Sequence, residues 1–98
     1  MNRFDLKNRT AIVTGGAQGF GLDIVKRFLN SGAKAIIWDI DENELLKVTK
    51  ELNNPNLSHN IVDVSNFKNV EETVNEITKS TNIDILINNA GITGSTES

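Results

Sequence analysis

The chain has 98 residues, of which 38% are hydrophobic and 23% charged, and its formal net charge is −3. These values fit one small globular domain and argue against a basic surface for nucleic acid or for an anionic membrane. Because the sequence has no cysteine, no apolar run of membrane-spanning length and no secretory signal at its start, we exclude disulfides and thiolate catalysis and expect a cytoplasmic protein.

Four short apolar runs predict buried strands, and the three segments between them have helical spacing. The strands are expected at residues 10–14, 35–39, 57–63 and 83–88. The apolar faces of the helices are expected to consist of Leu22, Val25, Phe28 and Leu29; of Leu45, Val48 and Leu52; and of Phe67, Val70, Val74 and Ile77. Gly32 is suited to end the first helix, Asp41 to cap the second, and the third is expected to begin near Ser65.

The alternation of strands and helices predicts an α/β fold, a three-layer doubly wound parallel sheet of the Rossmann type with strand order 3-2-1-4. Two helices would share one face of this sheet and one helix would cover the other, with the fourth strand at an unprotected edge. We therefore expect residues 1–98 to form the N-terminal half of a larger protein whose remaining strands follow. Alone, the fold is expected to be marginal or to associate.

Glycines are concentrated in the turn between the first strand and the first helix, which reads TGGAQGFG at residues 14–21. Gly15, Gly19 and Gly21 allow positive φ and a close approach of a ligand to the backbone. The free N–H groups of the first helical turn and the helix dipole favour an anion, and a pyrophosphate fits this description. The alternative is a merely flexible turn, whereas a P-loop is not indicated because the required Gly-Lys pair is absent.

An acidic residue, Asp39, ends the second predicted strand. Its carboxylate can accept hydrogen bonds from the adenosine ribose and would repel a 2′-phosphate. Because no Arg or Lys directly follows the glycine turn or this strand, the sequence predicts NAD rather than NADP. The alternative is that Asp39 only caps a loop, while Asp41 is better explained as a helix cap.

Two further segments follow the third and fourth predicted strands. Asp63 and Val64 offer a carboxylate and a backbone N–H to the edges of an adenine, although Asp63 could equally cap the next helix. Asn88, Ala90 and Gly91 belong to the stretch INNAGI, whose small residues suit a surface on which a nucleotide lies flat.

Together, TGGAQGFG, WDID, DVS and INNAGI resemble the short-chain dehydrogenase/reductase family over Leu6 to Gly91. The resemblance implies that the glycine turn binds the cofactor pyrophosphate and that Asp39 sets a preference for NAD. It also implies adenine contacts from Asp63 and Val64 and ribose contacts from the INNAGI stretch. The implied cofactor-binding residues are Gly15, Ala17, Gln18, Gly19, Phe20, Gly21, Asp39, Asp63, Val64, Asn88, Ala90 and Gly91.

The resemblance further implies NAD-dependent hydride transfer with a small alcohol or carbonyl substrate, in a parent protein that is a homo-oligomer. In the family, the proton donor is a tyrosine with a lysine four residues on, assisted by a serine and an asparagine, all beyond the fourth strand. The sequence contains no tyrosine. We therefore assign no catalytic residue and no metal ligand, and we expect these 98 residues to be inactive by themselves.

Two other functions remain open from the sequence. A non-catalytic dinucleotide-binding or interaction module would explain the missing tyrosine. An S-adenosylmethionine-dependent methyltransferase would share the glycine turn and the acidic end of the second strand. The threonine before Gly15 and the NNAG stretch speak against the methyltransferase.

Overall fold

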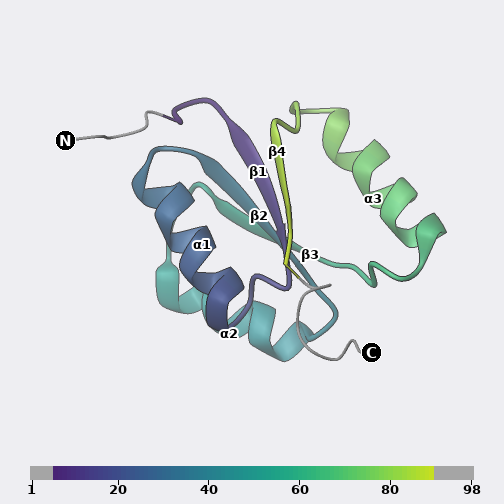
Figure 1. Ribbon diagram of the computed structural model, residues 1–98, viewed down its shortest axis with the longest axis horizontal. Coiled ribbons are helices and arrows are strands. Elements are labelled where there is room, and N and C mark those ends of the chain that lie inside the picture. The colour runs from purple at the N-terminus through teal and green to yellow at the C-terminus, as the bar shows by residue number, and fades with distance from the viewer. Residues whose placement is uncertain (1–5, 90–98) are drawn as a thin grey trace.

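The computed structural model describes residues 6–89, which form a four-stranded sheet flanked by three helices (Figure 1). Along the chain the elements are β1 (Thr10–Thr14), α1 (Gly19–Asn30), β2 (Lys34–Asp39), α2 (Glu42–Leu52), β3 (Leu57–Ile61), α3 (Phe67–Thr78) and β4 (Ile85–Asn88). The strands are parallel and their order is β3-β2-β1-β4. This arrangement confirms the doubly wound α/β fold and the strand order predicted from the sequence.

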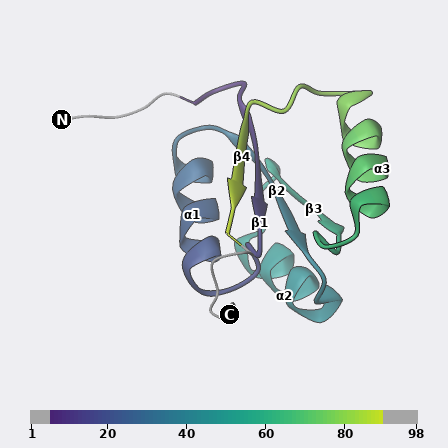
Figure 2. The ribbon, with the colours of Figure 1, turned by 45° about the vertical axis from the view of Figure 1, so that its right-hand side comes forward.

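Strand β1 is the most deeply buried element, and all five of its residues are buried. It pairs with β2 on one side and with β4 on the other, so that Val13 lies in register with Ile37 and Ile87. Figure 2 shows the arrowheads of β1 and β4 pointing to the same end of the sheet, where the chain turns into α1. A parallel strand that is covered on both faces needs a continuous apolar run, which Ala11, Ile12 and Val13 provide at the centre of β1, while the buried hydroxyls of Thr10 and Thr14 at its ends are hydrogen-bonded.

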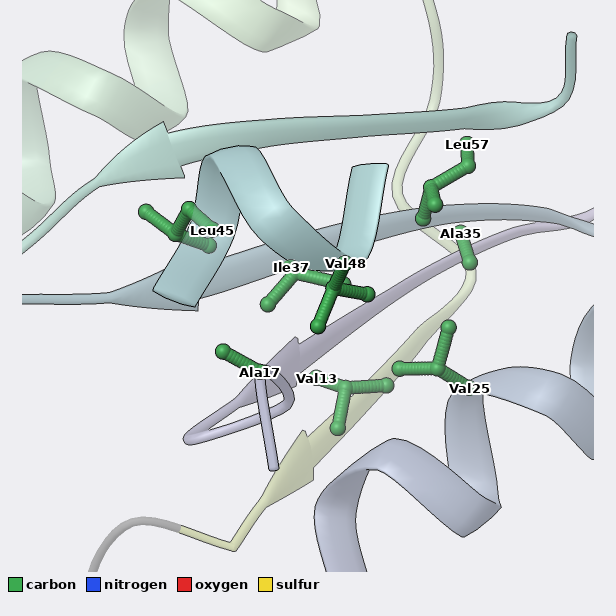
Figure 3. Close-up of a cluster of buried hydrophobic side chains, with 8 residues drawn as sticks. All are labelled: Val13, Ala17, Val25, Ala35, Ile37, Leu45, Val48 and Leu57. Atoms are coloured by element: carbon green, nitrogen blue, oxygen red, sulfur yellow. The ribbon is translucent and has the colours of Figure 1, made fainter. Parts of the chain in front are cut away.

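Helices α1 and α2 cover one face of the sheet and enclose the larger of two hydrophobic clusters (Figure 3). Its buried members are Val13, Ala17, Val25, Ala35, Ile37, Leu45, Val48 and Leu57. Each fully buried Val, Leu or Ile side chain contributes about 1.5–3 kcal/mol relative to an exposed one. This face of the sheet therefore supplies most of the apolar stabilisation.

Helix α3 lies on the opposite face (Figure 2) and covers it less completely. The buried cluster there consists of Ile12, Ile36, Trp38 and Val62, and α3 itself has no fully buried residue. Leu86 of β4, in register with Ile12 on this face, is 61% exposed. Among the described residues, nothing covers the β4 side of this face.

The helix ends follow the sequence signals, with one exception. Asp41 caps α2 by accepting a hydrogen bond from the Glu44 amide at 3.1 Å, and Gly32 follows α1 with a φ of 91°. Helix α3 begins at Phe67 after the cap residue Asn66, close to the start expected near Ser65. The assignment of Phe67 to the apolar face was wrong: it is 77% exposed, because this first helical residue lies one turn before Val70, where contact with the sheet begins.

Strands β3 and β4 are shorter than the sequence predicts because side chains replace ladder hydrogen bonds at their ends. Strand β3 ends at Ile61, and two residues later the Asp63 amide donates to Asn69 Oδ1 at 2.9 Å instead of to the sheet. Strand β4 begins at Ile85, since the Thr10 amide donates to the Asp84 carboxylate at 2.9 Å. Within residues 6–89, no helix is long and apolar enough to cross a membrane.

Candidate functional site

The turn from β1 into α1 requires glycine at three positions. Gly15 and Gly19 have φ values of 65° and 59°, which side chains with a Cβ rarely adopt. A Cβ on Gly21 would collide with the Gly15 carbonyl oxygen and lie 2.6 Å from Asn89 Nδ2. The turn is therefore folded tightly against the end of β4.

The first turn of α1 has backbone donors that no side chain caps. Gln18 occupies the N-cap position in an extended conformation and makes no side-chain capping bond. The first bond of the helix is donated by the Leu22 amide to the Gln18 carbonyl at 3.3 Å, so the amides of residues 19–21 precede any helical acceptor. Helices α2 and α3, in contrast, are capped by Asp41 and Asn66.

The other residues expected in the glycine turn lie in different environments. Ala17 is buried in the larger hydrophobic cluster, where its methyl group packs between the turn and α2 (Figure 3). Gln18 is exposed, and Phe20 is 70% exposed at the start of α1. The surface that a ligand can reach is therefore formed by Gln18, Phe20 and the glycine backbone rather than by Ala17.

The end of β4 is joined to the glycine turn by Asn89, a residue of the INNAGI stretch to which the sequence assigned no role of its own. Its side-chain Nδ2 donates to the Gly15 carbonyl oxygen at 3.2 Å, and the residue is 6% exposed. The neighbouring Asn88 accepts a hydrogen bond from Thr14 Oγ1 at 3.2 Å. A polar side chain directly after an apolar strand was the available signal for Asn89. Ala90 and Gly91 lie outside the described residues.

Asp39 lies at the end of β2, at the same edge of the sheet as the glycine turn. Its Oδ1 accepts a hydrogen bond from the Asp41 amide at 3.1 Å, and Oδ2 has no hydrogen-bond partner among the described residues. The residue is half-buried. One carboxylate oxygen is thus fixed by the turn, and the other remains available to a ligand.

Asp63 follows β3 at this edge and is held by Ser65. Its Oδ1 accepts hydrogen bonds from Ser65 Oγ at 2.6 Å and from the Ser65 amide at 2.9 Å. The Ser65 hydroxyl and then the Ser65 amide lower the pKa of the Asp63 carboxyl below its usual range. Asp63 therefore forms the turn before α3. The alternative interpretation, in which Asp63 caps this helix, was wrong, because the N-cap residue is Asn66. Val64 is exposed beside it.

The loops at this carboxyl edge of the sheet carry acidic side chains and no basic ones. No Lys or Arg occurs at residues 15–21, 39–46, 62–66 or 88–89. An anion at these loops would therefore meet backbone amides and neutral side chains rather than a formal positive charge. No group of three His, Cys, Asp or Glu side chains suited to a metal ion occurs among residues 6–89.

The sequence matches a known family of oxidoreductases. The family model described as short chain dehydrogenase matches residues 9–98. The chain belongs to the short-chain dehydrogenase family. The assignment made from the four sequence motifs is thereby confirmed.

Other members of the short-chain dehydrogenase family match over most of this chain. A 3-oxoacyl-(acyl-carrier-protein) reductase of Chlamydia pneumoniae is 43% identical over 91 residues, which cover 90% of this chain and 37% of the reductase. A 3beta-hydroxysteroid dehydrogenase of Eggerthella lenta is 40% identical over 90 residues, covering 89% and 35%. The crystal structure of a short chain dehydrogenase from Bacillus anthracis superimposes with a TM-score of 0.82 at 30% identity, covering 88% of this chain and 36% of that one. The chain thus spans little more than a third of the length of these relatives.

Proposed function

We propose that this short-chain dehydrogenase chain binds NAD(H) across the carboxyl edge of its sheet and supplies the cofactor site of an oxidoreductase. The observation that carries the proposal is the uncapped first turn of α1, which follows a glycine turn closed against β4. In the whole protein the site would serve hydride transfer between the nicotinamide and a small alcohol or carbonyl substrate.

The pyrophosphate is assigned to the start of α1. The amides of residues 19–21 have no helical acceptor, and the first turn carries no acidic side chain that would repel an anion. Backbone donors at a helix N-terminus are pre-oriented, so they bind phosphate oxygens without first having to be ordered. Asn89 fixes this arrangement by holding the Gly15 carbonyl oxygen.

The adenosine ribose is assigned to Asp39. Its Oδ2 can accept hydrogen bonds from the ribose hydroxyls while Oδ1 stays bonded to the Asp41 amide. A 2′-phosphate at this place would meet the carboxylate without a nearby Lys or Arg to offset the repulsion. The proposal is therefore specific for NAD rather than NADP.

The adenine is assigned to the space between the ends of β2 and β3. Here the Val62 amide donates to the Asp39 carbonyl at 3.0 Å, which brings the two strand ends together. Ile40 and Val64 both leave large apolar side chains exposed at this point. Covering the faces of an adenine would remove this apolar surface from water. Asp63 and the amides around it can serve the polar edge of the base.

Catalysis by these 98 residues is not expected. A bound nicotinamide would supply hydride chemistry, but reduction of a carbonyl also requires a proton donor, and the sequence has no tyrosine for the role that the family gives to one. The second candidate function is a dinucleotide-binding module without turnover. In the oxidoreductase proposal, the whole protein is cytoplasmic and homo-oligomeric.

Calorimetric titration of the natural polypeptide that carries these residues tests the cofactor assignment. NADH is expected to bind more tightly than NADPH, and S-adenosylmethionine is expected not to bind. In Asp39→Asn, the side-chain oxygen can still accept the hydrogen bond from the Asp41 amide, but the negative charge is lost. The preference for NADH over NADPH is therefore expected to fall about tenfold, equivalent to about 1.4 kcal/mol. Tighter binding of NADPH by the unaltered protein would refute the assignment. Turnover with an alcohol or a carbonyl compound separates the oxidoreductase from the binding module.

A further inference from the structure

We infer that the free edge of β3 is an interaction surface for a second copy of this chain, which adds its own β3 in antiparallel orientation. The two-fold axis of this pair passes beside Asn60, and helix α2 of each copy lies against α2 of the other through Leu46. The surface is separate from the glycine turn and requires no bound nucleotide. Its evidence is the hydrogen bonding of β3 and the order of charges along α2.

Strand β3 lies at one edge of the described sheet, and its hydrogen bonds to β2 show which backbone groups point outward. The Ala35 amide of β2 donates to the Asn56 carbonyl at 2.9 Å, and the Val62 amide donates to the Asp39 carbonyl at 3.0 Å. Backbone groups of a paired strand alternate between its two sides. Residues 58 and 60 therefore face β2, whereas the backbone groups of residues 57, 59 and 61 face away from the sheet.

Two of these outward-facing residues have backbone groups free for a further strand. The Leu57 amide is already used, since it donates to the Asn54 carbonyl at 3.0 Å. The amides and carbonyls of His59 and Ile61 have no other strand to bond among residues 6–89. In an antiparallel pair centred on Asn60, His59 of each copy faces Ile61 of the other and exchanges two hydrogen bonds with it. This register uses only groups that are free.

The edge also lacks the features that commonly prevent strand addition. Edge strands are often protected by charged side chains or by a proline. No Asp, Glu, Lys or Arg occurs at residues 53–62, and Pro55 precedes β3 rather than lying within it. Ile61, at the end of the strand, is 51% exposed. An added strand would satisfy the free backbone groups and cover this apolar side chain.

Helix α2 carries a stripe of exposed side chains beside this edge. The stripe consists of Glu42, Leu46 and Lys50, which are four residues apart and so share one side of the helix. Thr49, a neighbour of Leu46 on the helix surface, has its Oγ1 3.0 Å from His59 Nδ1, which places this side next to β3. Leu46 is 52% exposed. The stripe would therefore meet whatever adds to the edge of β3.

The stripe is complementary to a reversed copy of itself. When two α2 helices lie antiparallel, Glu42 of each copy faces Lys50 of the other, and the two Leu46 side chains meet between these pairs. Glu42 and Lys50 are exposed, and neither has an ion-pair partner within residues 6–89. Interfaces with two-fold symmetry require such self-complementary surfaces. The charge order thus favours a second copy over an unrelated strand.

The strand contact and the helix contact require the same two-fold axis. The bond between Thr49 and His59 gives a common reference point on α2 and β3. From this point, Leu46 lies about 4.5 Å toward the carboxyl end of the sheet, at 1.5 Å per helical residue. Asn60 lies about 3.3 Å in the same direction, at one strand residue. One rotation therefore brings both β3 and α2 against their symmetry mates.

Disulfide trapping tests this register. Facing residues at a non-hydrogen-bonded position of an antiparallel pair have Cα atoms about 4.5 Å apart, within the range that a disulfide spans. The 98 residues contain no cysteine. With Asn60→Cys in the natural polypeptide, mild oxidation by oxidised glutathione is expected to give a covalent dimer, measured by non-reducing electrophoresis against the unaltered polypeptide.

Ser58→Cys is the matched control, because residue 58 lies on the same face of β3 but away from the axis. Its two copies would be four strand positions apart, about 13 Å, which is beyond the reach of a disulfide. Its covalent dimer should therefore form at least about tenfold more slowly than that of Asn60→Cys. Equal rates in the two variants would overturn the interface and leave the proposed cofactor site standing.

Charge exchange in the Asn60→Cys protein tests the helix contact. Glu42→Lys should slow trapping about tenfold, because two ion pairs become two repulsive pairs. Adding Lys50→Glu reverses both charges and should restore the rate, although it puts a second unfavourable charge at an end of α2. Leu46→Lys should also slow trapping. Fluorescence of the buried Trp38 shows whether each variant is folded.

The double exchange decides between a paired surface and a general loss of stability. Restoration of the rate supports the contact between two α2 helices. Failure to restore it in a folded double variant would overturn the second copy as the occupant of this edge. If Asn60→Cys does not fold, sedimentation of the same charge variants without the cysteine carries the test, with dissociation expected for Glu42→Lys and reassociation for the double exchange.

Discussion

The two ends of the parallel sheet use their aspartates differently. At the amino end, Asp84 employs both carboxylate oxygens inside the protein: Oδ2 accepts from the Thr10 amide at 2.9 Å, and Oδ1 lies 3.6 Å from an Arg9 guanidinium nitrogen. At the carboxyl end, Asp39 has a single intramolecular bond, to the Asp41 amide. The first carboxylate is used fully within the fold, whereas the second has one oxygen without a hydrogen-bond partner among residues 6–89.

The two ends of the sheet also differ in the groups that they offer to an anion. The amino end has basic side chains, and a cavity of about 520 Å³ there is lined by Lys7, Asn8, Arg9, Thr81, Asn82 and Asp84. The carboxyl end has two glycines with positive φ in the turn before α1, an uncapped helix N-terminus and no Lys or Arg in its described loops. The proposed dinucleotide site thus lies at the end that offers backbone amides rather than at the end with basic side chains. Substitutions at the two ends should consequently affect different quantities.

The largest effect is expected from Gly21→Ala. The new Cβ would collide with the Gly15 carbonyl oxygen and would press on Asn89. Such overpacking costs about 1–3 kcal/mol of stability, and the displaced turn should weaken NADH binding by about tenfold or more. Fluorescence of the only tryptophan, the buried Trp38, reports unfolding, and calorimetry reports binding.

Gly32→Ala is the control for Gly21→Ala. It strains a left-handed position after the other end of α1 and should cost about 1–2 kcal/mol of stability. Its nearest neighbours belong to Lys7, far from the glycine turn, so NADH affinity should not change. Equal losses of NADH affinity in the two variants would contradict a special role for the glycine turn.

A smaller effect on binding is expected from Asn89→Ala. The variant removes the bond to the Gly15 carbonyl oxygen and leaves this oxygen without that partner, at a cost of about 1–2 kcal/mol. Because the glycine turn is then held less firmly, NADH affinity should fall about threefold to tenfold, equivalent to about 0.7–1.4 kcal/mol. Denaturant unfolding and calorimetry measure the two effects. A stable variant with full affinity would show that Asn89 does not position the turn.

Asp84→Ala should lower stability alone. The buried Thr10 would lose the acceptor of its amide, which costs about 1–3 kcal/mol. NADH affinity at the opposite end of the sheet should stay the same. The control is Glu76→Ala, which breaks an exposed pair with Lys79 and should cost less than about 0.5 kcal/mol. A clear loss of NADH affinity in Asp84→Ala would remove the distinction between the two ends.

The smallest effect is expected from Ser65→Ala. Loss of the hydroxyl should raise the pKa of Asp63 toward its usual range, since the bond from Ser65 is the main cause of the lowered value. A lowered pKa in the folded state stabilises the protein above about pH 4, and this contribution disappears as the pH falls through the folded pKa. The variant should therefore lose stability less steeply in acid. NMR titration of the Asp63 carboxyl measures the shift, and Ser65→Thr, which keeps a hydroxyl, should leave the pKa low.

Most of the fold could be predicted from the sequence, because local signals for strands and helix ends agree with the pattern of burial. Ala11, Ile12 and Val13 are apolar on both faces of β1, as a central strand requires, and Asp41 and Gly32 mark helix ends by well-understood chemistry. Phe67 was misassigned because spacing alone does not tell where a helix first meets the sheet. The ends of β3 and β4 were misplaced because Asn69 and Asp84 replace ladder bonds from a distance along the chain.

The candidate site was predictable where it depends on the backbone. The positive φ values at Gly15 and Gly19 were predictable because glycine adopts them readily, and the close approach at Gly21 agrees with the expected tight turn. Asn89 was missed because its bond to Gly15 joins residues 74 positions apart. The sequence likewise could not show which oxygen of Asp39 lacks a partner, because this depends on the hydrogen bond from the Asp41 amide to Oδ1.

The most direct test of the site is NMR mapping of NADH on the labelled natural polypeptide. The account predicts that the amides of Gly19, Phe20 and Gly21 shift most, followed by those after Asp39, while Arg9 and Asp84 at the amino end stay unchanged. Saturable binding that shifts the amino end and leaves the start of α1 unaffected would contradict the account, as would the absence of binding.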